Sequence, residues 1–154
     1  MSDNIAYSYL LYFHSYWRYL ALGLLIAAIV MAWRGWLGKM EYSAKDEKTA
    51  LFTMIAMHIQ FLVGIALYFM SPFVRFDGMK ATMSDAHLRF WTVEHLSLML
   101  IAVIIITLGR SAAKKLEVPT AKHKKIAIFF TIALVLILVS IPWPFTQVAR
   151  PLFR

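Results

Sequence analysis

The segment Phe90–Gly109 reads FWTVEHLSLMLIAVIIITLG and decides how this chain folds. Its only ionisable residues are Glu94 and His95, both near its start. A hydrocarbon core about 30 Å thick takes about 20 residues of helix, at a rise of roughly 1.5 Å per residue. The segment is therefore predicted to cross a membrane as one helix.

Three further segments have the same length and character: Phe13–Trp33, Ala50–Met70 and Ile126–Phe145. Apolar residues make up 61% of the chain and charged residues 16%, whereas soluble domains are about 45–50% apolar and about 25% charged. The connections are short, which favours antiparallel neighbours. The sequence predicts an all-α integral membrane protein, with residues 1–154 forming one antiparallel, up-down-up-down bundle of four helices.

Several residues predict where these helices begin and end. Ser43, followed by Asp46, is a typical helix N-cap, and Asp85 or Ser84 fits the same role before the third span. Proline disfavours helix at the residue before it, so the second span is expected to stop at Ser71-Pro72. Pro119 opens the last helix, which the segment Pro142–Pro144 is expected to close.

The net charge of +8 lies mostly outside the spans. Ten of the 16 basic residues fall in the stretches 34–48 and 110–125, against five in 75–89 and 150–154. The positive-inside rule places the first group in the cytoplasm and both termini outside. We expect the basic run at 114–125 to contact anionic lipid headgroups of the bilayer, and no nucleic acid to bind.

The sequence lacks a basic N-terminal region and cysteine, and these two absences limit the expected processing and the possible cofactors of the chain. The N-terminus has no basic residue before Arg18, so a cleavable signal peptide is not expected. The chain has no cysteine. Disulfides, thiolate metal ligands, iron–sulfur clusters and covalently attached c-type haem are therefore excluded.

His14, His58 and His95 lie inside or at the rim of three different spans, together with Arg18 and Glu94. Ionisable groups in a bilayer are costly and are functional-site candidates by default. Counting residues from the outer span ends places His14 about 2 Å deep, Arg18, Glu94 and His95 about 6–8 Å deep, and His58 about 18 Å deep. We expect His95 to point into the bundle, and Glu94 to face a neighbouring helix where Arg18 is its counter-ion.

The other two histidines, His87 and His123, fall outside the spans. Both are predicted to be surface residues, and His123 sits in a basic loop. Gln60, close to His58 on the second span, is expected to form a hydrogen bond between helices.

The first functional hypothesis is one non-covalent haem b. Haem iron takes two axial imidazoles from facing helices, and bundle interiors can supply them. His95 with His14 matches best in depth, whereas His95 with His58 requires a tilted helix. Arg18, Arg75 and Arg89 are candidates for pairing with the haem propionates.

Four stretches also carry a family resemblance: HSYWR at His14–Arg18, HIQFLVG at His58–Gly64, RFWTVEH at Arg89–His95 and IPWPF at Ile141–Phe145. With these stretches the chain resembles small bacterial four-helix inner-membrane proteins labelled cytochrome b-like and loosely grouped with b561-type electron carriers. The resemblance implies a bacterial inner-membrane location, haem b, and electron exchange with a quinone or a partner complex. The b561-type proteins offer two histidine pairs. Here Ile126–Phe145 has no histidine, so one haem is the maximum.

Two alternatives remain open. The same histidines, His14, His58 and His95, with Glu94 or methionine, suit copper or zinc, because imidazole and thioether bind copper(I) and imidazole with carboxylate binds zinc. The pair His95 and Met99 lies on one helix face. The third hypothesis is non-redox: proton conduction along the histidines, an accessory subunit, or hydrogen bonds that rigidify the bundle. No soluble catalytic constellation is visible, and the sequence leaves open whether the protein is an enzyme.

Overall fold

The computed structural model describes residues 5–151, which form helices joined by short loops. Four helical stretches are long and apolar enough to cross a membrane: α1 (Ile5–Leu37), α2 (Ala44–Met70), the stretch Ala86–Lys114 and α6 (Pro119–Ser140). The third stretch joins α4 (Ala86–Arg89), the π turn η1 (Phe90–Glu94) and α5 (His95–Lys114), and the short helix α3 (Met79–Ser84) precedes it. The prediction of an all-α, four-helix membrane protein is confirmed.

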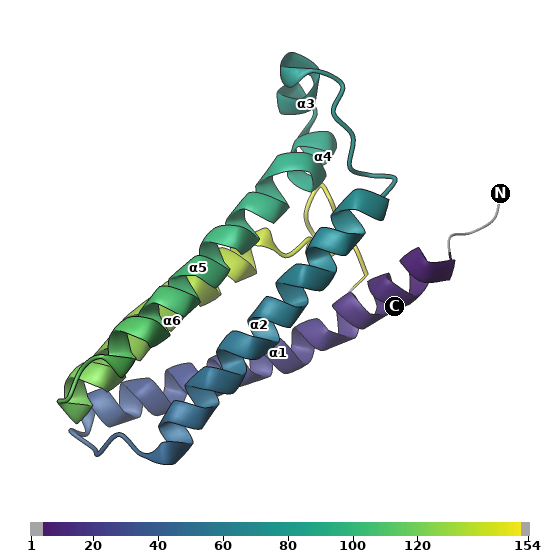
Figure 1. Ribbon diagram of the computed structural model, residues 1–154. Coiled ribbons are helices and arrows are strands. Elements are labelled where there is room, and N and C mark those ends of the chain that lie inside the picture. Colours follow the sequence, from purple (N-terminus) through teal and green to yellow (C-terminus); the bar gives the residue numbers. More distant parts are fainter. Residues whose placement is uncertain (1–4, 152–154) are drawn as a thin grey trace.

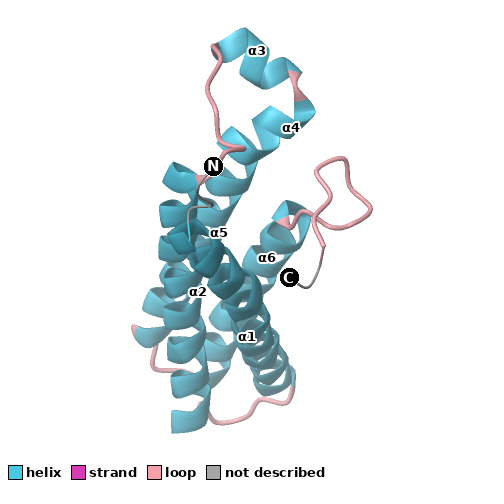
Figure 2. Cartoon of the chain, turned by 90° about the vertical axis from the view of Figure 1, so that its right-hand side faces the viewer, coloured by secondary structure: helices cyan, strands magenta, loops and turns pink. Residues whose placement is uncertain are grey.

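The four spans form an antiparallel bundle (Figure 1). Helix α1 packs against α2 and α6, and α5 packs against α6 and α2, so the order around the bundle is α1, α2, α5, α6. The connections 38–43 and 115–118 lie at one end, called the closed end below. The α2–α4 connection and the segment after α6 lie at the other, called the open end (Figure 2). The chain is a multi-pass membrane protein with lipid-facing apolar helices.

Local sequence explains most helix ends. Ser43 and Asp46 form a reciprocal capping box: Ser43 Oγ accepts from Asp46 N at 3.3 Å, and Asp46 Oδ2 accepts from Ser43 N at 2.9 Å. Helix α2 ends at Met70, because Ser71 is extended before Pro72. Asp85, and not Ser84, caps α4, since its carboxylate accepts from Leu88 N at 2.7 Å.

The span end predicted at Phe145 is wrong, whereas the expected stop at Pro142–Pro144 is confirmed. Helix α6 begins at Pro119 as expected but stops at Ser140, five residues before Phe145. Ile141 takes an extended backbone with ψ of 131°, which is the conformation that the following Pro142 imposes. The five apolar residues after Ser140 therefore belong to a segment that folds back over the bundle.

Small side chains hold the closed end together. Ala28 and Ala32 of α1 are buried, as is Ala127 of α6. Small residues let membrane helices approach closely and pack without gaps. Among the described residues of α1, none before Ala21 is buried. The bundle is therefore tightly packed at the closed end, and its helices diverge toward the open end (Figure 1).

Candidate functional site

A cavity of about 160 Å³ lies between the diverging helices. All four spans line it, together with the loop after α2 and the segment after α6. Most of its wall is apolar, with Leu22, Met57, Phe61, Val103 and Ile137 among the lining side chains. The polar lining residues are Tyr7, His14, Ser15, Arg18, Gln60, Tyr68, Ser71, Trp91, His95 and Arg150. The cavity is thus an apolar space with a few polar groups, as ligand sites usually are.

The π turn η1 sets the direction of His95. A π turn holds one more residue than an α-helical turn and so rotates the residues that follow it. Thr92, at its centre, is fixed from both sides: its carbonyl accepts from Tyr68 OH at 2.9 Å, and its hydroxyl donates to Arg75 O at 2.9 Å. His95 follows directly as the first residue of α5 and lines the cavity. The prediction that His95 points into the bundle is confirmed.

A backbone carbonyl fixes the tautomer of His95. Its Nδ1 lies 2.8 Å from the carbonyl oxygen of Ser140 on α6. A carbonyl can only accept, so Nδ1 carries the proton and the lone pair of the neutral ring is on Nε2. Metal-bound histidines almost always have this arrangement, with the second ring nitrogen donating to a fixed acceptor. His95 is therefore oriented as a nitrogen ligand.

His14 enters the cavity from α1. Gln60 Nε2 donates to the carbonyl oxygen of His14 at 3.0 Å, which ties α2 to α1 beside the ring and confirms Gln60 as an interhelical hydrogen bonder. His14 Nδ1 is buried and has no hydrogen-bond partner within the described part of the chain, and the same holds for Gln60 Oε1. A side chain at Gly64 would place its Cβ 3.2 Å from His14 Cε1. Glycine thus gives the imidazole the room that it occupies.

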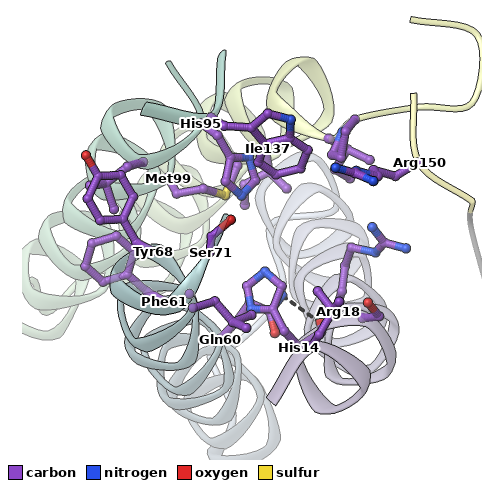
Figure 3. Close-up of a pocket in the computed structure, with 18 of the residues that line it drawn as sticks. His14, Arg18, Gln60, Phe61, Tyr68, Ser71, His95, Met99, Ile137 and Arg150 are labelled. Carbon is purple, nitrogen blue, oxygen red and sulfur yellow. Dashed lines mark hydrogen bonds between the residues drawn. The ribbon is translucent and has the colours of Figure 1, made fainter. Parts of the chain in front are cut away.

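The two imidazoles lie on opposite sides of the cavity (Figure 3). Met99, one turn after His95 on α5, also lines it, as do Met57 of α2 and Arg18 of α1. Two histidines, two methionines and a guanidinium around an apolar space form a donor set for a metal or a metallocofactor. These groups lie on three different helices, so they come together only when the helices have packed into the bundle.

The other two predicted site residues lie elsewhere. His58 is not in the cavity wall: its Nδ1 donates to Met54 O at 2.7 Å, and its Nε2 lies 3.4 Å from Thr107 Oγ1 of α5. Glu94 does not line the cavity either. The structure therefore brings together His14, Arg18 and His95, and the cavity does not connect all three intramembrane histidines.

The expected pairing of Arg18 with Glu94 is wrong. Glu94 Oε1 accepts from Arg89 Nε at 2.6 Å, so its partner lies in its own helical stretch. Arg18 instead donates to Tyr19 OH at 3.0 Å and lines the cavity. The similar predicted depth of Arg18 and Glu94 was not sufficient to pair them, because the π turn and the rotation of each helix decide which side chains meet.

The prediction for His123 is also wrong, whereas the one for His87 is confirmed. His87 is exposed and accepts from Trp91 Nε1 at 3.2 Å. His123 is only 1% exposed and packs at the closed end against Gly35 of α1. Its Nε2 donates to Glu41 O at 3.2 Å. The missing side chain of Gly35 makes space for this imidazole, which the basic composition of its surroundings did not indicate.

The donor residues that line the cavity suit a haem, but the free volume of the cavity is too small for one. An engineered cavity of about 150 Å³ holds one benzene ring, so a cavity of about 160 Å³ has to widen for a macrocycle. The side chains that would have to move include Met57, Phe61 and Met99, and methionine adapts readily because it has three rotatable bonds. No group of three or more His, Cys, Asp or Glu side chains suited to a metal ion occurs among residues 5–151. A zinc site built from three histidines and Glu94 is therefore not assembled.

Sequence reasoning missed Arg150 and Met57 as cavity residues. Arg150 lies in the segment after α6, and only the return of that segment brings it to the site. The sequence feature that indicates this return is the run IPWP at 141–144. It ends the helix before the basic residue Arg150 is reached. Of the arginines proposed for propionates, Arg75 pairs with Asp77 and Arg89 with Glu94, while Arg18 reaches the cavity.

Searches of protein-family models, curated proteins and solved structures find no match to this chain. Function is therefore inferred from the site alone.

Proposed function

We propose that this protein binds one haem b through His14 and His95 and transfers single electrons in the membrane. The observation that carries the proposal is His95: its Nδ1 proton is held by Ser140 O at 2.8 Å, and its Nε2 lone pair is left for a ligand. When bound, haem supplies a one-electron redox couple. The protein's part is to supply two imidazoles from α1 and α5 and to keep water out with an apolar wall.

Charge and space support the same ligand. Arg18 and Arg150 line the cavity, and guanidinium groups bind carboxylates such as haem propionates bidentately. Gly64 leaves room beside His14. Ala28 and Ala32 of α1 and Ala127 of α6 are buried toward the closed end, so these contacts can persist if the helices move apart at the cavity.

Copper(I) is the second candidate, and the methionines favour it. Met57 and Met99 line the cavity with His14 and His95, and these are the soft ligands that copper(I) prefers. The volume of about 160 Å³ suits an ion without any widening.

The absorption spectrum of the protein, purified in detergent from cells with ample haem supply, tests both candidates. We expect a Soret band whose companion bands sharpen on dithionite reduction, and about one haem per chain. Metal analysis of the same sample measures iron and copper. A colourless, iron-free protein contradicts the haem proposal, and about one copper per chain in that sample supports the second candidate. A sample with neither contradicts both.

The proposed location is a bacterial inner membrane with the closed end in the cytoplasm. The basic stretches 34–48 and 110–125 lie at the closed end and favour this orientation. The cavity then lies in the outer half of the membrane, so a quinone or redox partner exchanges electrons from that side.

A periplasm-active reporter enzyme fused after residue 154 tests the orientation. We expect it to be active, and a reporter fused within the connection 115–118 to be inactive. The reverse pattern would contradict the proposed orientation without bearing on the ligand.

A further inference from the structure

Two prolines follow the end of α6 at a spacing that affects the carbonyls behind them. In a helix each N–H donates to the carbonyl four residues earlier. If α6 continued, the donors for Leu138 O and Ser140 O would be the N–H groups of residues 142 and 144. Both of these residues are proline, which has no N–H. Neither carbonyl can therefore receive a helical hydrogen bond, even from a longer helix.

Both carbonyls accept from ring N–H groups instead. Trp143 Nε1 donates to Leu138 O at 2.8 Å, and His95 Nδ1 donates to Ser140 O at 2.8 Å. The first bond is local to the end of α6, whereas the second joins α6 to the histidine of α5 that lines the cavity. Ser140 is fully buried. A buried carbonyl in a membrane protein needs a partner from the protein itself, and for Ser140 that partner is His95.

The same prolines turn the chain away from the helix axis (Figure 2). Pro142 holds Ile141 in an extended backbone, with ψ of 131°. The chain then returns, and Pro142 and Pro151 line the cavity. Without these prolines, the apolar run 141–145 would be able to continue the span. The hydrogen bond that orients His95 and the wall beside it therefore have one cause.

We infer that Pro142 and Pro144 are positioning residues for His95. They end α6 and withhold two N–H donors, and so reserve the Ser140 carbonyl for His95 Nδ1. If a backbone N–H occupied that carbonyl, the imidazole proton would be free to move to Nε2. The ring would then present a donor where a metal needs a lone pair.

This inference deepens the proposed function and rests on it for its relevance to a bound haem or copper ion. The tautomer of His95 is nevertheless a property of the protein alone. It can be measured on the full chain in detergent, prepared without haem or metal, by nitrogen-15 NMR of labelled histidine. The His95 signals are assigned by their loss in His95→Gln.

We expect the unmodified chain to carry the His95 proton on Nδ1. In the double variant Pro142→Ala with Pro144→Ala, α6 should extend into the run 141–145. The new N–H at position 144 should then compete with His95 for Ser140 O. The ratio of the two tautomers should shift toward the Nε2–H form by roughly two- to tenfold, the change expected for the loss of one hydrogen bond.

His58 is the internal reference for folding. Its Nδ1 donates to Met54 O at 2.7 Å within α2, so its signals should be the same in every variant. Pro72→Ala is the matched control, because Pro72 is an exposed proline that follows the end of a different helix, α2. It should leave the His95 tautomer unchanged. Pro142→Ala alone should also keep the proton on Nδ1, because the second proline still has no N–H.

An unchanged His95 tautomer in the double variant, with the His58 signals intact, would overturn the inference. A shift in Pro142→Ala alone, or in Pro72→Ala, would overturn it as well. If altered His58 signals show that the double variant does not fold, Pro142→Ala decides: retention of the Nδ1 proton supports the inference, and its loss contradicts it. None of these results depends on haem content. A haem-free protein therefore contradicts the haem proposal alone, and a failed tautomer test contradicts the role of the prolines alone.

Discussion

Replacement of His95 by alanine is expected to remove essentially all bound haem. His95 supplies a ligand nitrogen whose orientation is fixed by Ser140 O at 2.8 Å. Alanine removes both the ligand and this tie between α5 and α6. The measurement is the amount of haem per chain in detergent-purified protein, which should fall from about one to near zero.

His58→Ala is the matched control for this loss. His58 is also an intramembrane histidine whose Nδ1 binds a backbone carbonyl, but it lies outside the cavity wall. Its removal should leave about one haem per chain. His14→Ala should behave like His95→Ala, because His14 supplies the opposite imidazole.

Chemical rescue with imidazole distinguishes a loss of haem ligation from a loss of folding. Imidazole added to the His95→Gly variant should restore the reduced spectrum, since the cavity left by the side chain can take the free base. Normal haem content in His95→Ala, or loss of haem in His58→Ala but not in His14→Ala, would contradict the assignment of His14 and His95 as the ligand pair.

Gly109→Ala is expected to destabilise the bundle by about 1–3 kcal/mol, the usual cost of overpacking a close-packed core. Gly109 is a buried residue of α5, and a Cβ there would overlap Cβ of Phe129 on α6. That Phe129 atom is attached directly to the backbone, so a change of rotamer cannot move it aside. The two helices would have to separate.

Gly23→Ala is the control for helix propensity. Gly23 lies in α1, is exposed, and has nothing within 4 Å of a Cβ built on it. Both substitutions gain the preference of alanine over glycine in a helix, about 1 kcal/mol in water, and differ in the steric overlap. Unfolding in mixed detergent micelles should show Gly109→Ala as less stable than the original chain and Gly23→Ala as equal or more stable. Equal stability of the two variants would contradict the close α5–α6 contact.

The sequence predicted those features that depend on near neighbours in the chain. Span number followed from apolar length, and the start of α2 followed from Ser43 and Asp46, which cap the helix within one turn. Pro119 and Pro72 marked helix ends because proline restricts its own and the preceding backbone. The last span, predicted to reach Phe145, ends at Ser140 because the same rule acts at Pro142.

The sequence also indicated the depth of the polar groups but not their directions. His14, Arg18 and His95 meet at one cavity, whereas His58 at its own depth contacts Met54 and Thr107 instead. Depth follows from counting residues along one axis. Direction follows from how each helix is rotated, and the π turn Phe90–Glu94 changes that rotation just before His95.

By itself the sequence determined a four-helix membrane protein with at most one site for a pair of intramembrane histidines, because hydropathy, capping and proline effects act within a few residues. Only the tertiary structure decided that His14 faces His95, that Glu94 pairs with Arg89, that His123 is buried against Gly35, and that Arg150 returns to the cavity. Apart from the Arg89–Glu94 pair, which lies within one helical stretch, those contacts join different helices or join the segment after α6 to the bundle. Their geometry depends on the packing of small side chains at the closed end and on helix rotation, which no single stretch of the chain specifies.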